Sequence, residues 1–91
     1  MASAADFEQA VGQLFAVAAG DRQISLELSA VKRIAFSPRP DGGFSLLFKG
    51  PRETALPQAT YRFTGNGEVH DIFIVPVAAD ATGLLYEAVF N

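Results

Sequence analysis

Residues 83–91, with the sequence GLLYEAVFN, decide the fold class of this chain. Successive side chains of a β-strand point to opposite faces, so Tyr86, Ala88 and Phe90 share one face and Glu87 lies on the other. Two aromatic residues on one face indicate a strand that packs against a core. We therefore expect this last strand to be part of the core and residues 1–91 to form one complete domain.

Further segments upstream carry strand patterns. The clearest alternation places Ile24, Leu26 and Leu28 on one face, with serine and glutamate between them. A second places Phe44, Leu46 and Phe48 on one face. We expect strands at 14–18, 24–36 with a bulge near Ala30, 44–50, 61–65 and 69–77.

The segment 69–77 is apolar on both of its faces. Phe73, Val75 and Val77 alternate with Ile72 and Ile74. This pattern predicts a strand that is central or lies under the helix, because both of its faces would then be covered. Pro76 cannot donate to a strand ladder, so this end of the strand should be an edge or a bulge.

Turn residues separate these strands, and a short helix precedes them. Ser3 is suited to cap a helix of about two turns, with Phe7 and Val11 on its inward side and Gly12 as its terminator. Prolines and glycines predict loops at 37–43 and 51–57, a hairpin turn at Gly65-Asn66-Gly67 and a turn at 80–83.

These elements predict a mainly β fold. We expect a small antiparallel β-barrel or roll of about six strands in meander order, preceded by one short N-terminal helix. A flat sheet would leave its phenylalanine face in water and its edges unpaired, which favours a curled sheet.

The composition indicates a globular chain with apolar surface to spare. Hydrophobic residues make up 49% of the chain, including eight Phe, and charged residues only 19%. Such a surplus in a small protein is often covered in an oligomer interface or lines a ligand cavity. These two possibilities define the functional alternatives.

Charge and cysteine content argue against several classes of function. The net charge of −3 and the single adjacent basic pair, Lys32-Arg33, argue against a nucleic-acid partner, and we expect that pair to be solvated. The chain has no cysteine, which excludes disulfides and thiolate chemistry. Met1–Asp6 shows no signal or membrane segment, so we expect a cytoplasmic protein with no membrane partner.

His70 is the strongest candidate for chemistry. Glu68 shares its strand face, and Asp71 is its neighbour in sequence. An imidazole and a carboxylate can bind a metal or transfer protons, but a metal site needs three or four ligands. We therefore favour an exposed position near the hairpin turn, and we predict no catalytic, cofactor-binding or metal-binding residues and no cofactor.

Other polar groups fit structural roles. The glycine clusters Asp41-Gly42-Gly43 and Gly65-Asn66-Gly67 do not precede a helix, as a phosphate-binding loop must. The nucleophile-elbow motif is missing around each of the serines Ser25, Ser29, Ser37 and Ser45. Arg62 and Glu87 both point away from the aromatic face and are candidates for a cross-strand ion pair.

Three pieces of the chain, Phe44–Pro51, Leu56–Phe63 and the closing Tyr86–Asn91, resemble those of a bacterial family of small uncharacterised domains. The family's domains have about 90 residues and end in YEAVFN, and the likeness extends from Phe7 to Asn91. The resemblance implies no activity, cofactor or site residue. It implies genes near those of phage-tail-collar-like or tail-fibre-like proteins, and hence a role in a particle or its assembly.

The leading hypothesis is a non-enzymatic protein-interaction or assembly module. It would present loops or a strand edge to a protein partner or to a second copy in a homo-oligomer. The alternative is a small β-barrel that binds an apolar ligand among its phenylalanines. Because five or six strands usually close around their own side chains, this alternative ranks lower.

Overall fold

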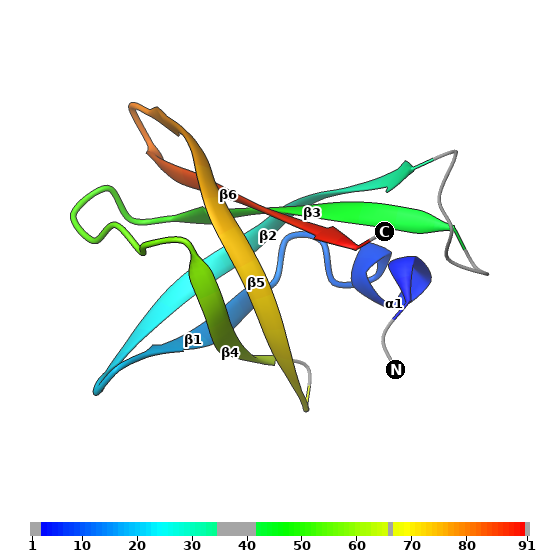
Figure 1. Ribbon diagram of the computed structural model, residues 1–91, viewed down its shortest axis with the longest axis horizontal. Coiled ribbons are helices and arrows are strands. Elements are labelled where there is room, and N and C mark those ends of the chain that lie inside the picture. Colours follow the sequence, from blue (N-terminus) through cyan, green and yellow to red (C-terminus); the bar gives the residue numbers. More distant parts are fainter. Residues whose placement is uncertain (1–2, 35–41, 66, 91) are drawn as a thin grey trace.

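A computed structural model describes residues 3–34, 42–65 and 67–90 of the chain. This part of the chain forms one helix and six strands (Figure 1). Their bounds are α1 Ala4–Glu8, β1 Leu14–Ala19, β2 Arg22–Ile34, β3 Gly43–Gly50, β4 Ala59–Gly65, β5 Glu68–Asp80 and β6 Gly83–Phe90. The mainly β fold with a short N-terminal helix is therefore confirmed. The expected ends of the second strand, at 35 and 36, and most of the loop 37–43 lie outside the described residues.

The strands form a closed antiparallel ring in the order β1-β2-β3-β6-β5-β4. Two three-stranded meanders make up this ring: β1, β2 and β3 pair in succession, and so do β4, β5 and β6. The connection from β3 to β4 joins strands that are not neighbours. Instead, β6 pairs with β3 and β4 pairs with β1, which closes the ring. Meander order thus holds within each half and not at this one step.

The inner face of the ring is the hydrophobic core, as the alternating patterns predict. Phe48 packs edge-on against Phe15, with ring centroids 5.9 Å apart, and lies 4.8 Å from the ring of Phe63. The largest fully buried side chains are Tyr86, Phe44, Phe48, Phe63, Leu26, Leu28, Leu46, Ile72, Ile74 and Val17. The C-terminal strand is part of this core, because Tyr86 and Ala88 are buried and Phe90 stacks on Phe44 at 4.7 Å.

Both expected irregularities occur. The register of β2 against β3 shifts between Leu28 and Ala30, which confirms the bulge near Ala30. The register of β5 against β6 shifts between Pro76 and Ala78. Pro76 lies opposite Tyr86 in a paired strand, so its place is a bulge and not a sheet edge.

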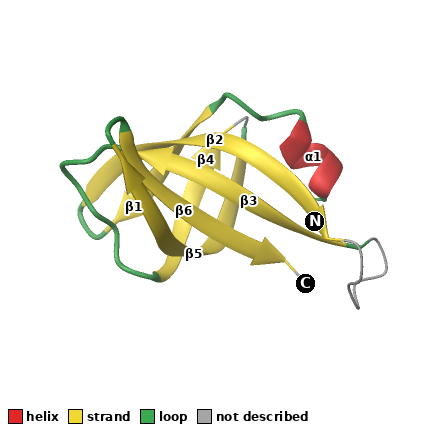
Figure 2. Ribbon diagram, turned by 90° about the horizontal axis from the view of Figure 1, so that it is seen from above, coloured by secondary structure: helices red, strands yellow, loops and turns green. Residues whose placement is uncertain are grey.

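The prediction that β5 is covered on both faces is wrong. Ile72 and Ile74 are buried, but Phe73 is 50% exposed and Val77 is 48% exposed. The helix is too short to cover an outer face, and it lies at one end of the ring (Figure 2). The alternation of side chains along β5 correctly distinguished its two faces, but it could not show that one of these faces lies in solvent.

Helix α1 closes that end of the ring through Phe7. Ser3 caps the helix in a capping box with Asp6. The ring of Phe7 is buried and lies 5.9 Å from Phe44 and 6.3 Å from Phe90. The expected inward position of Val11 is wrong: its side chain is 46% exposed, because the helix ends at Glu8 and the buried residue after it is Ala10.

Polar contacts fasten the helix and its following turn to β2. The guanidinium of Arg33 donates to both carboxylate oxygens of Glu8, at 2.9 and 2.8 Å. Gly12, at a φ of 92°, donates its N–H to the carbonyl of Leu28 at 2.8 Å. Gly12 therefore belongs to the turn that leads into β1, and it does not terminate the helix as expected.

Tyr86 links the core to the loop between β3 and β4. Its hydroxyl accepts a hydrogen bond from the buried N–H of Leu56 at 2.9 Å. It also lies 3.5 Å from the carbonyl of Thr54, to which it donates. A buried tyrosine usually needs such a partner, and here the partner is backbone that crosses to the other half of the ring.

We expect Tyr86→Phe to lower the free energy of unfolding by about 1–3 kcal/mol, because it leaves the buried Leu56 N–H without an acceptor. Urea denaturation measures this change. Tyr61→Phe is the matched control: its hydroxyl bonds the Pro57 carbonyl at an exposed position, so its loss should cost about 0.5 kcal/mol or less. Equal costs for the two variants would show that the Tyr86 hydroxyl does not support the loop.

The hydrogen bonds from Arg33 hold the pKa of Glu8 below the usual glutamate value. A carboxyl group whose folded-state pKa is lowered contributes stability above its unfolded pKa, and this contribution is lost as the pH falls through the folded pKa. We expect Arg33→Gln to raise the Glu8 pKa toward its usual value, as measured by NMR titration of the carboxyl carbon. Lys32→Gln, at the adjacent exposed position, should leave the Glu8 pKa unchanged.

Candidate functional site

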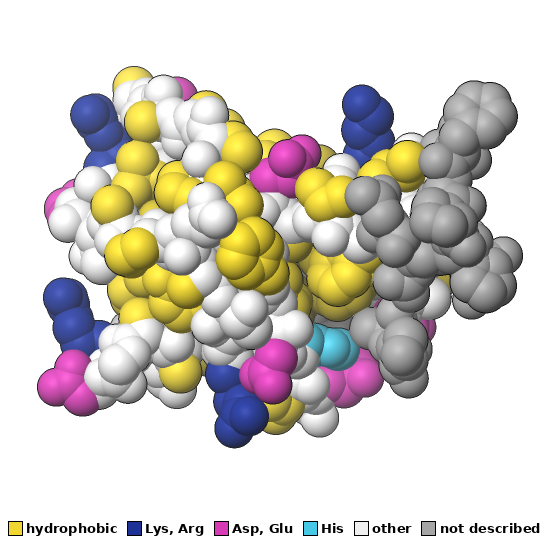
Figure 3. Space-filling model, viewed as in Figure 1, with side chains coloured by type: hydrophobic (Ala, Val, Ile, Leu, Met, Phe, Trp, Pro, Cys, Tyr) yellow, Lys and Arg dark blue, Asp and Glu magenta, His cyan; other side chains and the backbone are white. Residues whose placement is uncertain are grey.

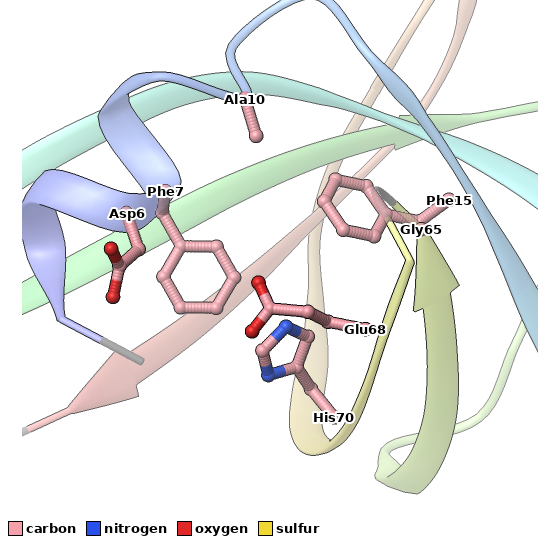
Figure 4. Close-up of a pocket in the computed structure, with 7 residues that line it drawn as sticks. All are labelled: Asp6, Phe7, Ala10, Phe15, Gly65, Glu68 and His70. Carbon is pink, nitrogen blue, oxygen red and sulfur yellow. The ribbon is translucent and has the colours of Figure 1, made fainter. Parts of the chain in front are cut away.

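The end of the ring under α1 contains a small cavity lined by both polar and apolar side chains. Glu68 and His70 line it from β5, and Phe7 and Asp6 line it from the helix. In Figure 4, the ring of Phe7 points toward Glu68 and His70, and Asp6 lies on the other side of that ring. Its volume is about 20 Å³, which is room for about one water molecule. Glu68 and His70 therefore share a face, as the strand period predicts.

His70 packs as an aromatic ring more than as an exposed polar group. It is half-buried, and its ring centroid lies 5.3 Å from that of Phe7. The expected exposed position is thus only partly correct. Sequence spacing gave no sign of this contact, because the helix that supplies Phe7 is far away in the chain.

Two of the carboxylates near His70, Asp6 and Asp71, have other partners. Asp6 accepts hydrogen bonds from the N–H of Ser3 at 2.9 Å and from its hydroxyl at 3.2 Å. Asp71 lies on the opposite face of β5 and pairs with Arg62 at 3.2 Å. Among the described residues, no three His, Cys, Asp or Glu side chains are placed so that they could hold a metal ion. The absence of catalytic and cofactor-binding residues stays a prediction.

The proposed ion pair between Arg62 and Glu87 is wrong. Arg62 lies on β4 and Glu87 on β6, and β5 separates these two strands. Arg62 instead pairs with Asp71, directly opposite on β5. The pair is exposed on both sides, so its contribution to stability is small.

The remaining sequence candidates are scattered. Arg33 binds Glu8, whereas its neighbour Lys32 is exposed on β2. Gly67, at a φ of 76°, follows β4 in the hairpin that leads to β5, which is the role expected for it. Ser25 and Ser29 are exposed on β2, and Ser45 is half-buried on β3. Asp41, Asn66 and Ser37 lie outside the described residues.

Apolar side chains gather on the outer surface of β5 and β6. We call this set the outer face; it consists of Phe73, Val75, Val77, Leu85 and Val89. Phe73, Val77 and Val89 are each about half exposed. Figure 3 shows hydrophobic atoms spread over the side of the molecule where β5 and β6 lie. A contiguous exposed apolar surface on a small protein marks a candidate interaction site.

A shallow groove continues the outer face across β6 to β3 and β2. Its volume is about 170 Å³, and its lining includes Leu47, Ala30, Lys32 and Glu87. Strand register joins the groove to the outer face, since Leu47 lies opposite Glu87 and Glu87 opposite Val75. Within the described part of the chain, Lys32 and Glu87 form no ion pair with each other.

The bulge near Ala30 is the sequence signal for this groove. A bulge bends its strand and changes the direction of the side chains that follow it. The change in strand register predicted the bulge, but not that the groove would continue onto the outer face.

Comparison with known proteins gives one match. No curated protein and no solved structure matches the chain. The model of a family described as a domain of unknown function, DUF6916, matches residues 2–90. This match confirms the resemblance to a family of small uncharacterised domains. The chain therefore belongs to the DUF6916 family of domains of unknown function.

Proposed function

We propose that the chain is a non-enzymatic protein-interaction or assembly module that binds its partner through the outer face of β5 and β6. The observation that carries this proposal is the exposure of Phe73, Val77 and Val89 on adjoining strands. Each of these side chains lies on a strand that contributes buried residues to the core.

The outer face has the composition of an interface centre. Interface hot spots are often aromatic residues surrounded by smaller contacts that exclude water. Phe73 supplies the aromatic side chain, and Val75 and Val77 lie beside it on the same strand. Fully burying a phenylalanine side chain is worth roughly 1.5–3 kcal/mol, so covering Phe73 would yield part of that amount.

The filled interior favours this function over the apolar-ligand alternative. Ligand pockets usually have volumes of about 300–1,000 Å³. The cavity at the helix end of the ring has about 20 Å³, and the phenylalanines inside the ring pack on one another. The spare apolar surface that the composition predicts therefore lies largely on the outside.

As a finer proposal, the partner is a component of a phage-tail-like particle that assembles in the bacterial cytoplasm. The support for this is the gene context that the family resemblance implies. Among the described residues, no helix is long and apolar enough to cross a membrane. The partner should therefore be sought among the components of such a particle, and it would bind through the outer face.

Site-specific photo-crosslinking in the native host tests the interaction. A photoreactive phenylalanine analogue at position 73 should form a covalent adduct with the partner, because Phe73 would lie at the centre of the interface. Mass spectrometry identifies the adduct. The analogue should leave the fold intact, since Phe73 points away from the core.

The matched control carries the same analogue at position 23. Gln23 is exposed on β2, outside the outer face and the groove. Adducts at 73 and none at 23 would support the proposal. No adduct at 73, or equal adducts at both positions, would rule out the outer face as the binding surface.

A further inference from the structure

β5 changes its pairing partner halfway along its length. Its residues 68–74 pair with β4, from Gly65 opposite Glu68 to Ala59 opposite Ile74. Its pairing with β6 begins at Val75, opposite Glu87, and continues to Asp80. In Figure 1, β5 and β6 diverge along their length, and β5 continues beside β4.

No strand is paired with the second side of residues 68–74 in the described part of the chain. The backbone hydrogen bonds outside the regular strands and helix involve other residues: Ser3–Ala10, Gly12, Gln13 and Leu28. Helix α1 approaches with the side chain of Phe7, which contacts His70. Backbone N–H and C=O groups on an open strand edge are a template for pairing with another chain.

We propose that the edge Glu68–Ile74 of β5 binds an extended segment of another protein as an added strand. The inference rests on the proposed function and specifies its geometry. An added strand would receive hydrogen bonds from the edge and would place alternate side chains beside Val69 and Phe73, which are both exposed. The far end of β5 is already paired with β6 and contains Pro76, which has no N–H to donate.

The charge of the edge indicates what the added strand should carry. Glu68 and Asp71 lie on the two faces of this segment, and Asp6 borders the cavity beside Glu68. Within the residues that the structure describes, Arg62 is the one cation that forms an ion pair with any of these carboxylates, and it binds Asp71. Opposite charges on adjoining strands are favourable and like charges are unfavourable. The complementary strand therefore carries Lys or Arg opposite these carboxylates.

The same reasoning disfavours a second copy of this chain as the occupant. In an antiparallel pair of identical edges centred on Asp71, this carboxylate would face its own copy. Like charges directly opposite each other destabilise a strand pair. The sequence of the edge thus selects a basic strand from a different protein.

A synthetic peptide with the sequence Thr-Val-Thr-Lys-Thr-Val-Lys is the probe. Antiparallel to β5 and in register with Ile74 at its first residue, it places valines opposite Phe73 and Val69 and lysines opposite Asp71 and Glu68. A control peptide has both lysines replaced by glutamate. Backbone amide NMR locates binding on the protein, and titration gives the affinity.

We expect the lysine peptide to shift the amide signals of residues 68–74 and to bind at least about tenfold more tightly than the glutamate peptide. Glu68→Lys should reduce this preference several-fold, and Gln23→Lys should not change it. N-methylation removes the hydrogen-bond donor of a backbone amide. The lysine peptide should therefore lose binding when the amides that face β5 are N-methylated, because they can no longer donate to the edge.

Three results would overturn the inference: no amide shift at about 2 mM peptide, equal binding of both peptides, or a dimer in sedimentation equilibrium whose contacts map to residues 68–74. If position 73 forms adducts in the host but the peptide does not bind, the proposed function stands and the added-strand geometry is rejected. Peptide binding without such adducts would support the edge and remove the outer face as the interface.

Discussion

The pairing of β6 with both β3 and β5 is the contact on which the whole ring depends. The chain builds two separate three-stranded meanders, and β6 is the strand of the second meander that joins the first along most of its length. The second junction, between β1 and β4, involves only Ala16–Ala18 opposite Arg62–Thr64. Without β6, the phenylalanine faces of both halves would lose the opposite wall of their shared core.

The closing strand can do this because of its alternation. Tyr86 and Ala88 point inward to the core that both meanders share, and the Tyr86 hydroxyl binds backbone of the loop between those meanders. At the far end, Phe90 stacks on Phe44, and Phe7 of the helix packs against both. The helix, which is too short to be stable alone, thus depends on the same strand for its packing surface.

Local patterns in the sequence predicted most of the fold. The period of two identified the inward residues of β2 and β3, and the irregularities at Ala30 and Pro76 correctly marked bulges. Contacts between distant segments could not be predicted in this way. The crossing from β3 to β4, the partner of Arg62 and the packing of His70 on Phe7 all depend on which segments meet in space.

The candidate site was predictable only in part, for a related reason. Alternation placed Phe73 and Val77 on one face of β5, but the residues alone could not show whether another layer covers it. The described residues form a single ring of six strands with no second layer outside it, so this apolar outer face stays in solvent. The excess of hydrophobic residues in the composition was the one sequence signal of this surface.

The open edge begins where β5 and β6 stop pairing. Their last pair is Val75 opposite Glu87, although β6 continues to Phe90 and is bound there by β3. The bulge at Pro76 lies within the paired part. It places one extra residue of β5 between two residues that are paired with β6. The first half of β5 is therefore paired with β4 on one side only. The strand that completes the ring thus also leaves the edge exposed, next to Val69, Phe73 and Val89. The same two strands, β5 and β6, thus close the core and leave an edge available to a partner strand.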